Sequence, residues 1–145
     1  MLKQSQWAQG LVQTPRPQTH GAVHVAHFVF PVTAALSTGD IIEIGELPPF
    51  ARITDAVIFS EGTFTGITGT VGIMSGEYGN LDESRTSDDL IFDGADMTTF
   101  ARLEKKEALL LAPTDMPRGI GVKVSGAVPG AAADKKIHLL LSYTQ

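Results

Sequence analysis

The sequence has 145 residues, of which 43% are hydrophobic and 19% charged, a composition that suits one globular domain with its own core and excludes a disordered chain. It contains no cysteine, which excludes a disulfide scaffold, a thiolate-bound metal and a cysteine nucleophile. Its 11 basic residues are scattered among 16 acidic ones, for a net charge of −5, so we expect no basic face for nucleic acid; no run of 18 apolar residues predicts a membrane span.

Residues 1–20 are predicted to form an extended N-terminal arm rather than part of the core. The segment is rich in glutamine, and its Thr-Pro-Arg-Pro sequence fits neither a helix interior nor a central strand. Four of its residues are candidates for docking on a partner: Trp7, Leu11, Val12 and Arg16. Trp7 could equally fold back onto its own domain, because tryptophan serves both interfaces and cores. The arm lacks the apolar stretch of a secretory signal, so we expect the protein to stay in the cytoplasm of its producing cell or to leave without a peptide signal.

From residue 22 onward the pattern is that of short β-strands separated by turns that contain Gly and Pro. About eight short strands are predicted from segments that are apolar or alternate apolar with polar residues: 22–32, 41–47, 52–60, 63–75, 109–112, 119–127 and 137–143, with a short apolar patch at 90–92. Residues 94–102 are predicted to form one or two helical turns, and 104–108 a helical or charged turn. This pattern, without a strand–helix–strand rhythm, predicts an all-β fold: a single antiparallel, jelly-roll-like β-sandwich over 21–145.

Alternation within the strands groups side chains by face. In the last two strands it places the following residues on one face each: Ile120, Val122 and Val124; Ile137, Leu139, Leu141 and Tyr143. In 52–60 it places Ile53, Asp55, Val57 and Phe59 on one face, and Thr54, Ala56 and Ile58 on the other. Glycines at 66, 69 and 72 interrupt the strand at 63–75 and predict bulges or the close approach of another backbone.

Residues 77–97 carry the acidity of the protein, with seven acidic side chains and a single basic one, Arg85. We interpret the segment as an acidic surface loop whose candidate residues are Asp82, Glu83, Asp88, Asp89, Asp93 and Asp96. A solvated loop and an acidic patch that faces a partner are both compatible with this composition. Calcium binding is a further alternative, although the spacing does not match the EF-hand loop.

The sequence offers no catalytic constellation, so we predict that the protein is not an enzyme and holds no cofactor. No nucleophile elbow, P-loop or dinucleotide-binding motif is present. A metal-dependent jelly-roll enzyme would use His20, His24 and His27, but residues three apart in a strand point to opposite faces, so His24 and His27 should not converge. We therefore expect no metal site; the four histidines, including His138, are predicted to be polar or interface residues of a sheet.

Four stretches of the chain form a recognisable set. They are 39–49, in which Gly-Asp and apolar residues precede Leu-Pro-Pro; the strand at 51–58; the segment 112–124; and the final strand at 136–145. With these, the chain resembles the small head decoration (cement) proteins of tailed phages. The resemblance implies a jelly-roll-like β-sandwich, often trimeric, that sits on the outer capsid surface where major capsid proteins meet. It implies no catalytic or ligand residue.

The leading hypothesis is therefore a structural virion protein, made in the host cytoplasm, that binds the assembled capsid from outside and stabilises it. Its partners would be the major capsid protein and other copies of itself in a homotrimer, with residues 1–20 reaching a partner. Such a protein needs many weak contacts repeated by symmetry rather than a pocket. The alternative is a carbohydrate- or receptor-binding module of a phage head or tail fibre, for which Trp7 and Tyr78 would be the aromatic platforms.

Overall fold

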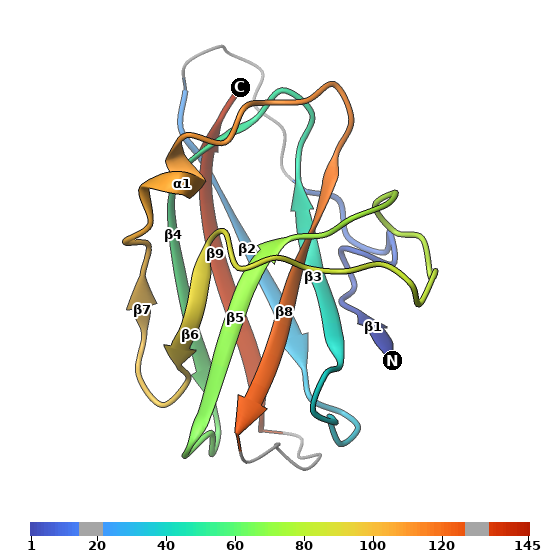
Figure 1. Cartoon of the computed structure of the whole chain (residues 1–145), viewed down its shortest axis with the longest axis vertical. Coiled ribbons are helices and arrows are strands. Elements are labelled where there is room, and N and C mark those ends of the chain that lie inside the picture. Colours follow the sequence, from blue (N-terminus) through green and yellow to red (C-terminus); the bar gives the residue numbers. More distant parts are fainter. Residues whose placement is uncertain (15–21, 127–133) are drawn as a thin grey trace.

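The computed structural model describes residues 1–14, 22–126 and 134–145, which form two packed β-sheets and one short helix (Figure 1). The elements are β1 (Leu2–Gln4), β2 (His24–Pro31), β3 (Ile41–Leu47), β4 (Arg52–Glu61), β5 (Ile67–Ile73), β6 (Phe92–Asp96), β7 (Ala101–Arg102), α1 (Lys106–Leu109), β8 (Arg118–Gly126) and β9 (Lys136–Thr144). The five-stranded sheet has the order β1-β3-β8-β5-β6, and the four-stranded sheet the order β2-β9-β4-β7. The predicted all-β sandwich is thereby confirmed.

The order of the strands is that of a jelly roll. Among the eight strands β2 to β9, the first, eighth, third and sixth share one sheet, and the second, seventh, fourth and fifth share the other. The pairings among these eight are antiparallel, whereas β1 adds to β3 in parallel. Within the described ranges the only helix has four residues, so none there is long and apolar enough to cross a membrane.

The core lies between the two sheets, where the alternating residues of each strand meet. The residues grouped on one face of each of the last two strands are all buried: Ile120, Val122, Val124, Ile137, Leu139, Leu141 and Tyr143. Across the sandwich, those of β8 face Ala26, Phe28 and Phe30 of β2, and those of β9 face Ile42 and Ile44 of β3. Alternation therefore indicated correctly which side chains of β8 and β9 form the core.

The faces assigned to β4 need a correction. Ile53 is buried, but so are Ala56 and Ile58, which alternation placed on the opposite face. The register between β4 and β9 shifts between Ile53 and Asp55, so one extra residue exchanges the two faces within the strand. As a result Val57 and Phe59 point away from the core.

Two local predictions were also wrong. Residues 94–102 contain no helical turn; they form the end of β6, a turn and β7, because β6 pairs with β5 and β7 with β4. Residues 109–112 are not a strand, because Leu109 ends α1 and 110–112 follow it as an irregular segment; the apolar patch at 90–92 leads into β6, which begins at Phe92. Each of these segments takes its structure from a neighbouring strand or connection rather than from its own pattern.

Candidate interaction surfaces

The first residues of the chain lie against the edge of the five-stranded sheet. β1 pairs with β3, with Gln4 opposite Glu43, and the hydroxyl of Ser5 donates a hydrogen bond to the carbonyl oxygen of Ile44. No strand was expected in this segment, because three residues that pair in parallel leave no periodic pattern in the sequence. Residues 1–14 thus rest on the sandwich by both backbone and side-chain contacts.

Trp7 packs on its own domain. Its ring meets the buried ring of Phe28 edge-on, with 5.7 Å between ring centroids and planes at 89°. The hydroxyl of Tyr78 donates a 2.6 Å hydrogen bond to the carbonyl oxygen of Trp7. Both aromatic residues are half-buried, and these contacts tie the N-terminal segment to the domain.

The other candidate docking residues of the N-terminal segment differ in exposure. The backbone N–H groups of Leu11 and Val12 donate to the carbonyl oxygen of Gln6, at 2.9 and 3.3 Å, which closes a compact turn. Leu11 is 70% exposed and Val12 is also exposed, whereas Arg16 lies outside the described residues. That these residues reach a partner stays a prediction.

Arg85 anchors the acidic segment to the sheet. Its Nε donates to the carbonyl oxygen of Ser75 at 2.8 Å, its Nη1 to that of Asn80 at 2.7 Å, and its Nη2 to the carboxylate of Glu43. The Arg85 and Glu43 side chains are almost entirely buried. A buried charge of this kind is tolerated only when it is paired and hydrogen-bonded.

The carboxylate of Glu43 accepts two further hydrogen bonds besides the one from Arg85. Its Oε1 accepts hydrogen bonds from the Gln4 side chain at 3.0 Å and from the Gly79 backbone N–H at 3.1 Å, while Oε2 accepts from Arg85. One carboxylate therefore holds together β3, the N-terminal segment and the acidic segment. Glu43 was not among the predicted site residues; the one available signal was that Arg85 is the single basic residue among seven acidic ones in residues 77–97.

Glycines allow the acidic segment to lie directly on the outer face of the five-stranded sheet, which it crosses in Figure 1. A Cβ atom at Gly119 would overlap the carboxylate of Glu43, one at Gly121 would collide with Ser87, and one at Gly72 would overlap Asp88. The close backbone approach predicted at Gly72 is thus confirmed. The chain covers this face of the sandwich with its own residues.

The acidic side chains mostly shape turns. Asp82 accepts hydrogen bonds from the backbone N–H and the hydroxyl of Ser84, and Asp96 accepts the same two bonds from Thr98. In each case the bond from the backbone N–H is the main cause that lowers the pKa of the carboxyl, and the bond from the hydroxyl is the second. Asp88 and Asp89 contact other parts of the chain.

Asp88 accepts from the backbone N–H groups of Ile73 at 2.8 Å and of Leu90 at 3.0 Å, and Asp89 lies 3.8 Å from the ammonium group of Lys105. Glu83 and Asp93 are exposed. Across the described ranges, no three acidic or histidine side chains converge as metal ligands, and this includes the calcium candidates Asp88, Asp89, Asp93 and Asp96.

The histidines do not form the triad of a metal enzyme. His20 lies outside the described residues, and His24 stacks on Tyr143 whereas His27 points from the opposite face of β2, as the odd spacing predicts. His27 instead meets His138, with 2.8 Å between Nε2 and Nδ1. This pair is the main polar feature on the outer face of the four-stranded sheet.

Two neighbours complete the histidine pair. The ring of Phe59 stacks on His138 with 4.6 Å between centroids, and a carboxylate oxygen of Glu61 lies 3.4 Å from His138 Nε2. Because a hydrogen bond between two imidazoles needs a donor and an acceptor, at least one ring is neutral when the bond is formed.

Acidification from about pH 7 to about pH 5 is expected to destabilise the fold through His27. Burial, and secondarily the charge of His138, lower the pKa of His27 from 6.5, and Glu61 opposes them in part. Above 6.5 this residue leaves the stability unchanged; as the pH falls through 6.5 the unfolded chain takes up the proton more readily, so the free energy of unfolding decreases. Denaturant unfolding as a function of pH should therefore have a shallower slope in this window for His27→Gln. An unchanged slope in that variant would contradict the assignment.

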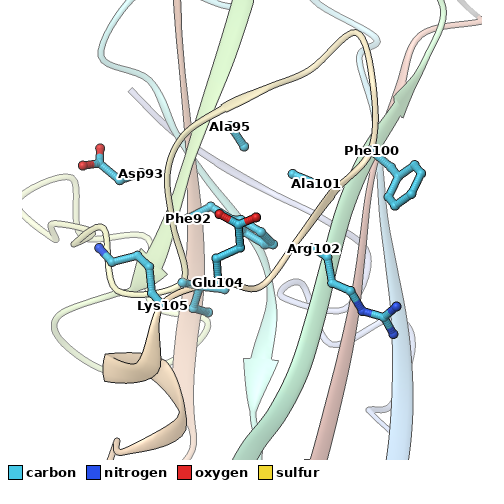
Figure 2. A pocket seen from close by; sticks show the side chains of 9 residues that line it. Phe92, Asp93, Ala95, Phe100, Ala101, Arg102, Glu104 and Lys105 are labelled. Carbon is cyan, nitrogen blue, oxygen red and sulfur yellow. The ribbon is translucent and has the colours of Figure 1, made fainter.

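A cleft of about 650 Å³ opens at the edge of the sandwich between β6 and β7 (Figure 2). Phe92 and Ala95 from β6 and Ala101 from β7 supply its apolar wall, and the charged groups at its rim include Arg102 and Lys105. Asp93 and Glu104 also line the cleft, and its lining residues include no serine, threonine, cysteine or histidine. It is a surface cleft with an apolar wall and a charged rim.

Comparison with known proteins places this jelly roll among phage capsids. A chain of the capsid of Ralstonia phage GP4 aligns with all of this chain and 98% of its own length, at 35% identity and a TM-score of 0.91. A chain of the cyanophage Pam1 capsid asymmetric unit aligns with 92% of this chain and 91% of its own at 19% identity and TM-score 0.60. A chain of the acidic stable capsid of Helicobacter pylori bacteriophage KHP30 aligns with 88% of this chain and 90% of its own length, at 12% identity and a TM-score of 0.56. No family model and no curated protein matches.

The two matches below 25% identity show a shared fold, whereas the match to the Ralstonia phage GP4 chain shows a common family. The similarity to the GP4 chain, at 35% identity over the whole of the present chain, identifies this protein as a phage head protein, a structural component of the virion. More particularly, the chain belongs to the same family as the Ralstonia phage GP4 capsid chain, which it matches over nearly the whole length of both.

Proposed function

We propose that this head protein is a decoration (cement) protein, which binds the outside of the assembled capsid as a homotrimer and stabilises it through contacts with the major capsid protein. The kinship with a capsid chain supports a place in the virion. The sandwich buries the inner faces of both its sheets against each other, so it is suited to join a shell as a finished unit.

The observation that favours attachment through the N-terminal segment is that the exposed Leu11 lies on a hydrogen-bonded turn fixed to the sandwich. The turn that carries it is closed on Gln6, and β1 and Trp7 fix the segment to the sandwich. An exposed leucine held by such a support loses little conformational entropy on binding, which is the usual property of an interface anchor.

Capsids that lack this protein provide the test. Purified wild-type protein should bind their outer surface to saturation and raise the temperature at which the particles open. The double variant Leu11→Ser/Val12→Ser should bind about tenfold more weakly, because about 1.4 kcal/mol of apolar contact is lost. Point variants are preferable to deleting residues 1–20, since deletion would also remove β1 and uncover Phe28.

The matched control is Leu110→Ser, because Leu110 is 72% exposed, as Leu11 is, but lies at the end of α1. It should bind like the wild type. Equal binding by the Leu11/Val12 variant would remove the role of the N-terminal segment. Failure of the wild-type protein to bind complete shells from outside, or a shell that does not assemble without it, would reject the decoration function itself.

A further inference from the structure

The turn between β3 and β4 holds an aromatic residue in a backbone conformation that aromatic residues rarely adopt. The N–H of Ala51 donates a 3.2 Å hydrogen bond to the carbonyl oxygen of Pro48, which closes a β-turn with Pro49 and Phe50 at its centre. Phe50 has a φ of +61°, the only positive φ of a non-glycine residue in the part of the chain that the structure describes. Because proline fixes φ near −65°, the turn is of type II, whose third position favours glycine or asparagine.

Burial does not compensate the strain at Phe50. The side chain is 61% exposed, so the ring gains little from the core of its own domain. A bulky residue at positive φ is strained, and strain of this kind persists only where the surrounding structure imposes it, most often at binding sites. An aromatic ring that is both strained and exposed therefore points to a contact outside the domain.

Two hydrogen bonds from other parts of the chain hold the turn in place. The N–H of Phe50 donates to the carbonyl oxygen of Thr114 at 2.7 Å, and the side-chain amide of Gln145 donates to that of Pro49 at 2.6 Å. In Figure 1 the turn between β3 and β4 and the loop that leads into β8 lie at the same end of the sandwich. The ring of Phe50 is thus presented on a fixed support.

Residues 48–51 and 112–117, which we call the apical loops, also present an exposed methionine. Met116 is 60% exposed, and its carbonyl oxygen accepts a 2.8 Å hydrogen bond from the hydroxyl of Thr114. The apical loops contain four of the eight prolines in the sequence and a single charged residue, Asp115. Because proline restricts the backbone, such loops lose little conformational entropy on binding, and few charges have to be desolvated.

The apical loops are continuous with the turn that carries Leu11. Tyr78 and Met116 line one cleft of about 460 Å³. Tyr78 also lines a second cleft of about 440 Å³ together with residues 8–10, which immediately precede Leu11. The exposed side chains of Leu11, Met116 and Phe50 therefore belong to one continuous surface.

We propose that Phe50 and Met116 are anchors that enter apolar pockets on the outer surface of the major capsid protein. The proposal rests on the decoration function proposed above and extends its binding surface from the N-terminal segment to the apical loops. Two side chains of about 200 Å² each are too small to hold a partner alone, since a stable contact covers about 1,000 Å² or more. They need an adjoining surface, and the surface that adjoins them carries Leu11.

Capsids that lack this protein, titrated with purified variants, provide the test. Phe50→Gly should bind at least tenfold more weakly, because an anchor is lost. The same variant should melt about 3 °C higher than the wild type, because glycine adopts a positive φ without strain. Phe50→Tyr keeps the ring and should bind within about twofold of the wild type.

The matched control is Phe100→Gly, because Phe100 is 70% exposed but lies outside the apical loops and has no positive φ. It should melt lower than the wild type, since glycine increases the entropy of the unfolded chain, and it should bind capsids as the wild type does. The same replacement at two exposed phenylalanines is thus expected to have opposite effects on stability, and only the one at Phe50 should weaken binding.

The outcomes separate the anchors from the decoration function. If the wild type binds and Phe50→Gly binds equally well, the anchor is overturned and the decoration function stands. A lower melting temperature for Phe50→Gly would contradict the strain on which the inference is based. Failure of the wild type to bind complete shells would reject the decoration function and the anchors with it.

Discussion

Replacing Arg85 with alanine is expected to lower the free energy of unfolding by about 3–5 kcal/mol, the cost of leaving one partner of a buried ion pair without the other. In the variant the buried carboxylate of Glu43 keeps only the hydrogen bonds from Gln4 and Gly79 and has no opposite charge beside it. It also removes the two bonds that hold the acidic segment at Ser75 and Asn80. Denaturant unfolding followed by circular dichroism measures the loss directly.

The control for Arg85 is Arg102→Ala, which breaks the ion pair between Arg102 and Asp55 at the edge of the sandwich. The Arg102 side chain is 70% exposed, so its loss should cost no more than about 1 kcal/mol. The double variant Glu43→Leu/Arg85→Met should be less destabilised than the sum of its two single variants, because neither charge is left unpaired. A loss below 1 kcal/mol for Arg85→Ala would show that the buried pair does not anchor the acidic segment.

Phe28→Ala should cost about 3–5 kcal/mol and lower the melting temperature by about 10 °C, because it opens a cavity in a packed core. The ring of Phe28 is fully buried, contacts Trp7, and occupies the space that a side chain at Gly45 would need. Trp7 is the one tryptophan in the sequence, so its fluorescence reports this site alone. A shift of its emission to longer wavelength is expected in the folded variant.

Phe100→Ala is the matched control for Phe28→Ala, because the Phe100 side chain is 70% exposed near the cleft of Figure 2. Its effect should remain within about 0.5 kcal/mol, with unchanged tryptophan emission. Equal melting temperatures for the two variants would mean that the N-terminal segment and β2 do not pack as the structure has them.

The strands whose pattern repeats regularly could be predicted from the sequence. Residues 41–47 coincide with β3, and 137–143 lie within β9 with their predicted core residues buried. In β9 alternation within a single segment contains enough information, since every second residue from Ile137 to Tyr143 is buried, whereas in β3 it gives the bounds of the strand but not the burial of Glu43 and Glu46. The jelly-roll class follows from the number and spacing of such strands.

The remaining features depend on contacts that are distant in the sequence. Residues 94–102 have a locally helical composition, but Gly94 adopts a φ of +70° and its N–H donates to Thr70 at 3.2 Å, which fits the edge of a sheet. Alternation leaves Glu43 with the polar residues of β3, and it is buried only because Arg85 approaches it from 42 residues further along the chain. The bulge in β4, which turns Val57 and Phe59 outward, also leaves no signal in the local alternation.

The bonds to Glu43 also determine when parts of the molecule can become ordered. Its three partners lie 36 to 42 residues away in the sequence, and each requires β3 to be in place before it gains a bond. Contacts between residues this far apart in the sequence form only after the intervening loops have closed. The N-terminal segment and the acidic segment are therefore expected to become ordered late in folding. Because they share one carboxylate, the two segments also open together when the native protein fluctuates, as a single cooperative unit on the five-stranded sheet.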